Sequence, residues 1–207
     1  MVSEEKSQRL SFPVMEIFYS IQGEGFHQGK PAGFVRLAGC DVGCHWCDVK
    51  ESWKTDTYPL LSPAEIGAEV AEYPSDMTII TGGEPVMYNL DALTDTLKRR
   101  GKKIHLETSG AYALSGNWDW ITLSPKKSKK PLNEYFLRAD ELKVIVYNKS
   151  DIKWAEELAG KVKKECKLFL QPEWGNTQKI MPLILEYIGM NPVWRISLQV
   201  HKYLGVR

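Results

Sequence analysis

Short runs of apolar and β-branched residues alternate with longer amphipathic stretches along this 207-residue chain. The apolar runs have the length and the residue types of buried strands. Ser62, Pro63 and Glu65 mark the start of a helix, because serine can cap, proline fits the first turn and glutamate can reach back to the cap. We expect strands over residues 14–21, 33–39, 77–81, 103–108, 119–125, 141–147, 167–172 and 193–199, and further helices over about 90–100, 151–164 and 177–187.

The alternation of strands with helices predicts an α/β fold with a mostly parallel sheet. Parallel strands joined by right-handed crossovers can curl the sheet, so we expect a partial, incomplete TIM-like βα barrel of about six parallel strands. The chain shows no long linker and no visible repeat, and 207 residues suit one domain over residues 1–207.

Polar and glycine-rich groups follow several of the expected strands. In parallel sheets the reactive groups gather where the strands end, so we expect these groups to share one mouth. They are Gly82-Gly83-Glu84-Pro85, Thr108-Ser109-Gly110, Ser124-Pro125-Lys126, Gln171-Pro172 and Gln199.

Composition excludes some classes of function. A formal net charge of +1 gives no attraction to nucleic acid or to an anionic membrane. No apolar run approaches the roughly 18 residues that cross a bilayer, and the polar start MVSEEKSQRL lacks the apolar core of a secretory signal. We therefore expect a cytoplasmic protein, whose cysteines stay reduced.

Three of the four cysteines lie within eight residues, as Cys40, Cys44 and Cys47. Three thiolates in one short loop can hold a 4Fe–4S cluster and leave one iron without a protein ligand, where a cofactor can bind. Zinc is the alternative, with His45 as a fourth ligand, but structural zinc sites usually join two separated ligand pairs. Cys166 stands apart, and we interpret it as an ordinary thiol.

The spacing Cys-x3-Cys-x2-Cys, with Trp46 before the last cysteine, resembles the radical S-adenosylmethionine superfamily. The Gly82-Gly83-Glu84-Pro85 motif is similar to the glycine-rich segment of that superfamily, which meets the methionine end of S-adenosylmethionine. The resemblance implies a 4Fe–4S cluster and S-adenosylmethionine as cofactors, with Glu84 as an acceptor for an ammonium group.

Further motifs resemble the 7-carboxy-7-deazaguanine synthase family, from about residue 14 to residue 207. They are Ile17-Phe18-Tyr19-Ser20-Ile21-Gln22-Gly23-Glu24-Gly25, Arg36 four residues before the first cysteine, Ser124-Pro125-Lys126, Gln171-Pro172 and the tail His201-Lys202-Tyr203-Leu204-Gly205-Val206-Arg207. The resemblance implies a lyase that converts 6-carboxy-5,6,7,8-tetrahydropterin to 7-carboxy-7-deazaguanine with release of ammonia, on the pathway to queuosine and other deazapurines. A 5′-deoxyadenosyl radical would take a hydrogen from C6 of the pterin, and the hydrogen would return after the ring rearranges.

The resemblance also implies roles for single residues. Arg36 would hold the substrate carboxylate, although an ion pair is its simpler interpretation; Gln22 would read the pterin edge and Glu24 would accept from its amino groups. The implied substrate site is Ile21, Gln22, Gly23, Glu24, Arg36, Thr81, His201 and Arg207, the last through its main chain. The implied S-adenosylmethionine site is Trp46, Gly83, Glu84, Ser109, Ser124, Pro125, Lys126 and Gln171.

Val49 departs from the family pattern, in which a hydroxyl residue at this position contributes to a Mg²⁺ site. A valine side chain cannot ligate a hard cation. Mg²⁺ is then absent, or is held by substrate, water and a neighbour such as Asp48 or Glu51. We expect activity to depend on Mg²⁺ less than in relatives with threonine.

The implied partners are a flavodoxin- or ferredoxin-type electron donor and a second copy of the chain in a homodimer. Two alternatives remain open at this point. One is a radical S-adenosylmethionine activase of a glycyl-radical protein, which shares the cysteine spacing and the short length but generally lacks the Gln-Gly-Glu-Gly loop and the tail. The other is a non-enzymatic zinc-binding module.

Overall fold

A computed structural model describes residues 10–207 of the chain. Its strands form one nine-stranded sheet in the order β3-β1-β2-β4-β5-β6-β7-β8-β9. All seven strands from β2 to β9 along this order run parallel, whereas β1 pairs antiparallel with both β2 and β3. The strands are β1 (Phe12–Ile21), β2 (Pro31–Leu37), β3 (Leu60–Leu61), β4 (Met77–Gly82), β5 (Lys103–Thr108), β6 (Trp120–Leu123), β7 (Glu141–Val146), β8 (Lys167–Pro172) and β9 (Trp194–Ile196).

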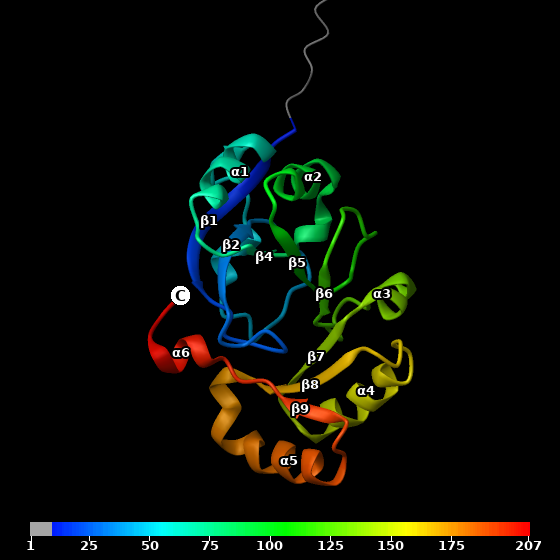
Figure 1. The fold of residues 1–207 in the computed structure, drawn as a ribbon. Coiled ribbons are helices and arrows are strands. Elements are labelled where there is room, and N and C mark those ends of the chain that lie inside the picture. Colours follow the sequence, from blue (N-terminus) through cyan, green and yellow to red (C-terminus); the bar gives the residue numbers. More distant parts are fainter. Residues whose placement is uncertain (1–9) are drawn as a thin grey trace, which may run out of the picture.

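The sheet curves into an open, partial barrel, with helices along its outer side (Figure 1). This confirms the expected α/β fold, with seven parallel strands instead of about six. The helices are α1 (Pro63–Ala71), α2 (Asp91–Arg99), α3 (Asn133–Arg138), α4 (Lys149–Ala159), α5 (Thr177–Met190) and α6 (Val200–Leu204), with 3-10 turns η1 (Lys50–Trp53), η2 (Pro85–Met87) and η3 (Trp174–Asn176).

Local sequence explains where the helices begin and end. The expected cap of α1 is confirmed: Ser62 and Glu65 form a reciprocal capping box. Helix α4 begins earlier than expected, because Asn148 and Asp151 form a second capping box, and it ends at Gly160 rather than near residue 164. The short elements β3, α3 and α6 were not expected, since two to six residues carry little periodicity.

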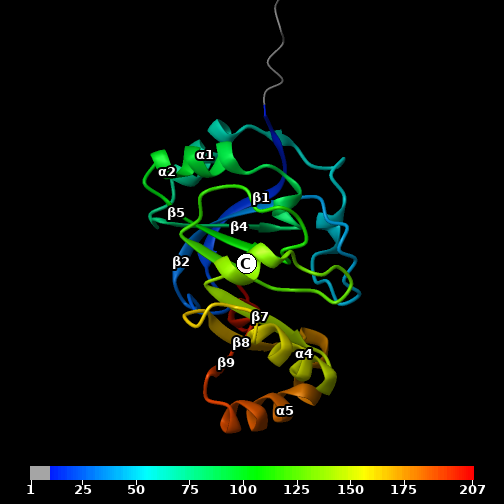
Figure 2. The same ribbon diagram turned by 90° about the vertical axis from the view of Figure 1, so that its right-hand side faces the viewer.

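The hydrophobic core lies between the sheet and its outer helices. Leu37, Ile80, Leu106 and Leu123 come from four neighbouring parallel strands and are fully buried in it. Figure 2 shows the long segment between β2 and β3, which carries the three clustered cysteines, at one edge of the curved sheet. A second, smaller apolar cluster consists of Phe18, Ala32, Phe34, Met77 and Ile79, and two of its members, Phe18 and Phe34, also line the cavity of the barrel.

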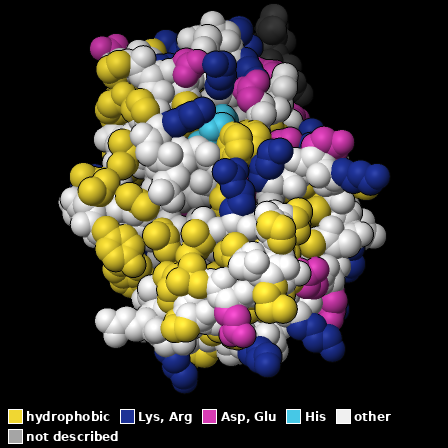
Figure 3. Space-filling view, turned by 60° about the horizontal axis from the view of Figure 1, so that its bottom comes forward, with side chains coloured by type: hydrophobic (Ala, Val, Ile, Leu, Met, Phe, Trp, Pro, Cys, Tyr) yellow, Lys and Arg dark blue, Asp and Glu magenta, His cyan; other side chains and the backbone are white. Residues whose placement is uncertain are grey.

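Charged side chains of both signs are present on the face that Figure 3 turns forward, interspersed with hydrophobic ones. Within residues 10–207, no helix is long and apolar enough to cross a membrane.

Candidate functional site

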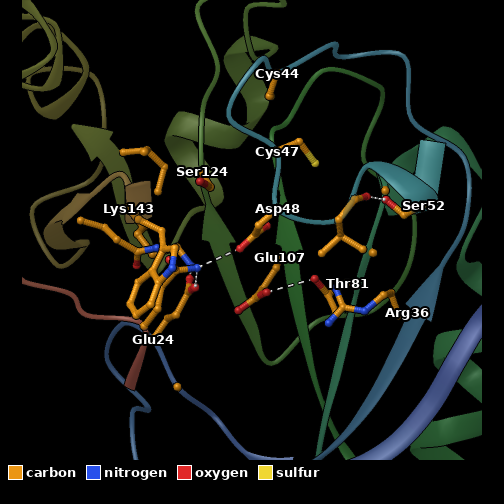
Figure 4. Close-up of a pocket in the computed structure, with 18 of the residues that line it drawn as sticks. Glu24, Arg36, Cys44, Cys47, Asp48, Ser52, Thr81, Glu107, Ser124 and Lys143 are labelled. Carbon is orange, nitrogen blue, oxygen red and sulfur yellow. Dashed lines mark hydrogen bonds and ion pairs between the residues drawn. The ribbon is translucent and has the colours of Figure 1, made fainter. Parts of the chain in front are cut away.

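A cavity of about 660 Å³ opens where the parallel strands end. The loops that we expected at one mouth do meet there. All the predicted substrate, cofactor and cluster residues line this cavity except Pro125, which is buried beside it. Figure 4 shows Cys44 and Cys47 at one side of this space, Glu24 and Lys143 at a second and Arg36 and Thr81 at a third.

The cysteine loop is joined to the end of β4 by close backbone contacts. The amide of Glu84 donates to the carbonyl of Gly39 over 2.8 Å. A β-carbon on Gly83 would stand 2.2 Å from that carbonyl oxygen and 3.0 Å from Cβ of Cys40. Gly83 is thus required because two backbones touch, which fixes the glycine-rich motif against the first cysteine.

The three clustered thiols suit an iron–sulfur cluster. They are partly exposed, line the same cavity and form no disulfide. Burial raises the pKa of Cys40 and of Cys44, and the ammonium of Lys126 opposes that rise at Cys44. Within residues 10–207, no three cysteine, histidine or acidic side chains converge on a single ion. A cubane cluster needs no such convergence, because each thiolate binds a different iron.

The fourth cysteine, Cys166, and the alternative zinc ligand, His45, lie outside the cavity. His45 is exposed and packs edge-on against the ring of Trp46, with 4.3 Å between ring centroids. Cys166 is buried in the hydrophobic core, and burial raises its pKa to about 12. The donor set therefore fits a 4Fe–4S cluster held by three cysteines, and it lacks the fourth ligand of a structural zinc site.

Glu84 is 2% exposed and receives three hydrogen bonds. The Thr108 hydroxyl donates to one carboxylate oxygen, and the amide and hydroxyl of Ser109 donate to the other. A buried carboxylate is stable only with such partners. Glu84 is thereby held as a fixed acceptor beside the cysteines, as the methionine ammonium of S-adenosylmethionine requires.

Lys126 and Gln171 complete the cofactor side of the cavity. Nζ of Lys126 donates to the carbonyl of Ser124 over 2.5 Å and to its hydroxyl over 2.7 Å. The Gln171 side chain is buried and accepts from the Ser197 hydroxyl over 2.7 Å. These contacts hold the two side chains beyond β6 and at the end of β8, where both line the cavity.

Glu107, at the end of β5, was missed by the sequence reasoning. Its two carboxylate oxygens accept from Nε2 of Gln22 over 2.9 Å and from the Thr81 hydroxyl over 3.0 Å. The ends of β1, β4 and β5 thus bring Gln22, Thr81 and Glu107 together in the cavity. Figure 4 shows the hydrogen bond between Thr81 and Glu107. In β5, the alternation that puts Ile104 and Leu106 in the hydrophobic core puts Glu107 on the opposite face, and this alternation was the available signal.

Arg36, on β2, lines the cavity and also forms an ion pair. Its Nε donates to one oxygen of Glu16 over 2.8 Å, and no other guanidinium nitrogen of Arg36 donates a hydrogen bond within residues 10–207. The remaining fork can therefore receive a carboxylate. Nη1 of Arg207 reaches the other oxygen of Glu16 over 3.2 Å, and Ser20 donates to the Arg207 carbonyl over 2.6 Å. The chain end thus lies beside Arg36.

Glu24 follows β1 and faces Lys143 of β7, the second residue that sequence reasoning missed. Nζ of Lys143 forms an ion pair with one oxygen of Glu24, and Nε2 of Gln199 donates to the other over 2.9 Å. In β7, Lys143 alternates with the core residues Leu142 and Val144, so the same alternation was available in the sequence.

The C-terminal segment covers part of the cavity. The Val200 amide donates to the carbonyl of Gly23 over 3.0 Å, and a β-carbon on Gly23 would collide with the ring of His201. Nζ of Lys202 donates to Asp48 over 2.6 Å. The tail thereby connects the substrate loop with the segment that follows the last cysteine.

The residues around Val49 do not build a Mg²⁺ site. Val49 lines the cavity but offers no side-chain ligand. The Asp48 carboxylate already accepts from Lys202 and from Gln199. Glu51 is exposed and does not line the cavity. Of Asp48, Val49 and Glu51, Asp48 alone thus brings an oxygen ligand to the cavity.

Comparisons with known proteins agree with this geometry. Residues 35–125 match the model of the radical SAM superfamily. A 7-carboxy-7-deazaguanine synthase from Flavobacterium psychrophilum is 49% identical over 99% of this chain and 96% of its own length. One from Synechocystis is 48% identical over 96% of this chain and 95% of its own.

A crystal structure of QueE from Escherichia coli has the same fold, with a TM-score of 0.84 and 32% identity. It covers 92% of this chain and 95% of its own. With these identities over nearly the full length, the chain belongs to the 7-carboxy-7-deazaguanine synthase family of the radical SAM superfamily.

Proposed function

We propose that the chain converts 6-carboxy-5,6,7,8-tetrahydropterin to 7-carboxy-7-deazaguanine and releases ammonia. One observation carries the proposal: a three-cysteine cluster site shares a single cavity with Arg36, Gln22, Glu24 and Glu107. Cys40, Cys44 and Cys47 would hold the cluster, which together with S-adenosylmethionine would supply a 5′-deoxyadenosyl radical. The protein's own side chains then determine which molecule meets that radical and in which orientation.

The polar groups of the cavity match the two ends of this pterin. The open fork of Arg36 suits the C6 carboxylate, because a guanidinium binds a carboxylate through two parallel hydrogen bonds. The pyrimidine ring carries an amino group and a ring N–H on one edge, and Glu24 and Glu107 supply acceptors for such donors. Binding both ends fixes C6 relative to the cysteine side of the cavity.

The cofactor side is built to hold S-adenosylmethionine by its polar groups. Glu84 would accept from the methionine ammonium, while Ser109, Ser124, Lys126 and Gln171 would surround the remainder of the molecule. The tail at His201 and the exposed Trp174 close part of the opening, since Trp174 packs against Tyr203 of the tail with 5.2 Å between ring centroids. Water is thereby kept from a reactive radical.

Anaerobic turnover tests the proposal. The protein is reconstituted with iron and sulfide, reduced and incubated with S-adenosylmethionine and the carboxylated pterin, and the products are identified by mass spectrometry. We expect 7-carboxy-7-deazaguanine and an equal amount of ammonia. A protein that has its cluster and cleaves S-adenosylmethionine but forms no deazaguanine would refute the proposal.

An activase of a glycyl-radical protein is the alternative with the same cysteine spacing. The near full-length similarity to 7-carboxy-7-deazaguanine synthases argues against it, because that similarity includes the Gln-Gly-Glu-Gly loop and the tail, which such activases generally lack. The resemblance further supports a flavodoxin- or ferredoxin-type electron donor, a homodimer and a cytoplasmic location. Reduction of the cluster by purified flavodoxin or ferredoxin tests the electron donor. Light scattering of the reconstituted protein tests the homodimer.

A further inference from the structure

Lys143 is a buried cation inside the barrel. It occupies the third position of β7, its side chain is 6% exposed, and it lines the cavity. Removing an ammonium group from water costs several kcal/mol unless opposite charges and hydrogen bonds compensate. Its partners therefore indicate what it does (Figure 4).

The direct partner of Lys143 is Glu24. The ammonium meets one oxygen of the Glu24 carboxylate, and the Gln199 amide holds the other over 2.9 Å. Both oxygens are thus held by groups of the protein interior, while the carboxylate itself lines the cavity. Each oxygen keeps a lone pair for another donor.

Glu24 and its surroundings contain several further charges. His201 of the tail and Lys126 face it, and Glu107 and Glu141 face Lys143. Burial raises the pKa of Glu24, but the charge and the hydrogen bond of Lys143 outweigh burial and hold that pKa below its ordinary value. Burial also raises the pKa of Glu141, to about 7.

The states of the three carboxylates indicate that the Lys143 ammonium acts mainly on Glu24. Glu141 can be protonated near neutral pH, and Glu107 is satisfied by Gln22 and Thr81. Of the three carboxylates around Lys143, Glu24 alone forms an ion pair with it.

We propose that Lys143 is a positioning residue for substrate recognition, whose ammonium holds the Glu24 carboxylate charged and aimed at the donor edge of the heterocycle. This inference rests on the proposed function and deepens it. It predicts selectivity for ring systems that present an amino group beside a ring N–H, because a neutral Glu24 would present a donor of its own to that edge.

Lys143→Met in the reconstituted holoenzyme tests the proposal, since methionine fills similar space without charge. We expect kcat/KM for the carboxylated pterin to fall at least about 30-fold, mostly through KM. We also expect the variant to lose substrate binding as the pH drops through neutrality, while the wild type does not. Lys143→Arg, which keeps the charge, should recover part of the loss.

Two comparisons separate positioning from folding. Lys163→Met removes a lysine that also forms an ion pair with a carboxylate, Asp140, over 2.8 Å, but lies away from the cavity. This control variant should leave KM for the pterin unchanged. The double variant Lys143→Met with Glu24→Gln should be no worse than Glu24→Gln alone, because the ammonium acts through that carboxylate. A double variant that shows the full additive loss would overturn the proposal.

A titration decides the matter without activity. Carbon-13 glutamate labelling resolves the Glu24 carboxyl signal, which is assigned by its loss in Glu24→Gln. The Glu24 pKa should be at least about one unit higher in Lys143→Met than in the wild type. An unchanged pKa overturns the role of Lys143 whatever the activity is. If the pKa does rise while the wild type makes no deazaguanine, the proposed function fails and the role of Lys143 at Glu24 stands.

Discussion

Glu141 should make the protein less stable as the pH rises through neutrality. It is 2% exposed at the start of β7, and its Oε2 accepts from the Phe26 amide over 3.0 Å. Among the described residues 10–207, its Oε1 has no hydrogen-bond partner. Burial raises its pKa from 4.5 to about 7, with the charge of Glu107 adding to the effect and that of Lys143 opposing it.

The direction and size of the effect follow from this difference. Between pH 4.5 and 7 the folded protein keeps a proton that the unfolded chain has released, so the free energy of unfolding falls as the pH rises through this window. One pKa unit corresponds to about 1.4 kcal/mol, so Glu141 costs about 3 kcal/mol of stability above pH 7. Glu141→Gln removes the ionisation and keeps an acceptor for the Phe26 amide.

Urea unfolding followed by circular dichroism, with both proteins kept anaerobic, measures this cost. At pH 8 the Gln variant should be more stable than the wild type by up to about 3 kcal/mol, and below pH 5 the two should converge. A difference that stays constant from pH 5 to pH 8, or a variant that is less stable at pH 8, would refute the reasoning.

Three further predictions concern the cavity. Arg36→Met should raise KM for the carboxylated pterin about 100-fold and leave S-adenosylmethionine cleavage intact, as steady-state kinetics would show; an unchanged KM would rule out Arg36 as the carboxylate ligand. Gly83→Ala should reduce iron content, measured against protein, because its β-carbon would meet the Gly39 carbonyl at 2.2 Å; full iron loading would contradict this. Turnover should depend little on Mg²⁺, and Val49→Thr should increase both that dependence and Mn²⁺ binding seen by electron paramagnetic resonance. Equal stimulation of wild type and variant would contradict the role of Val49.

The alternation of strands and helices and the cysteine spacing were readable because they depend on local sequence. Parallel strands end at one edge, so the loops after them were bound to meet. The glycine-rich motif was also readable, but the sequence did not show why residue 83 must be a glycine. Gly83 is needed because β4 passes against the backbone before Cys40, a contact between segments more than 40 residues apart.

Glu107 and Lys143 could not be assigned from sequence because their roles depend on register. Alternation places both on the face of their strands opposite the hydrophobic core, and only the curvature of the sheet shows that this face points to the inside of the barrel. The Lys143 ion pair joins residues 119 positions apart in the chain. Short elements such as α6 were also missed, since tertiary contacts rather than periodicity stabilise five-residue helices.

Turnover of a pterin that carries deuterium at C6 tests the central claim most directly. If the cavity aims C6 at the radical and the hydrogen returns after rearrangement, deuterium should appear at the 5′ carbon of recovered S-adenosylmethionine while 7-carboxy-7-deazaguanine accumulates. Product that forms without transfer of the label would contradict the orientation. Cofactor cleavage without any deazaguanine would contradict the function itself.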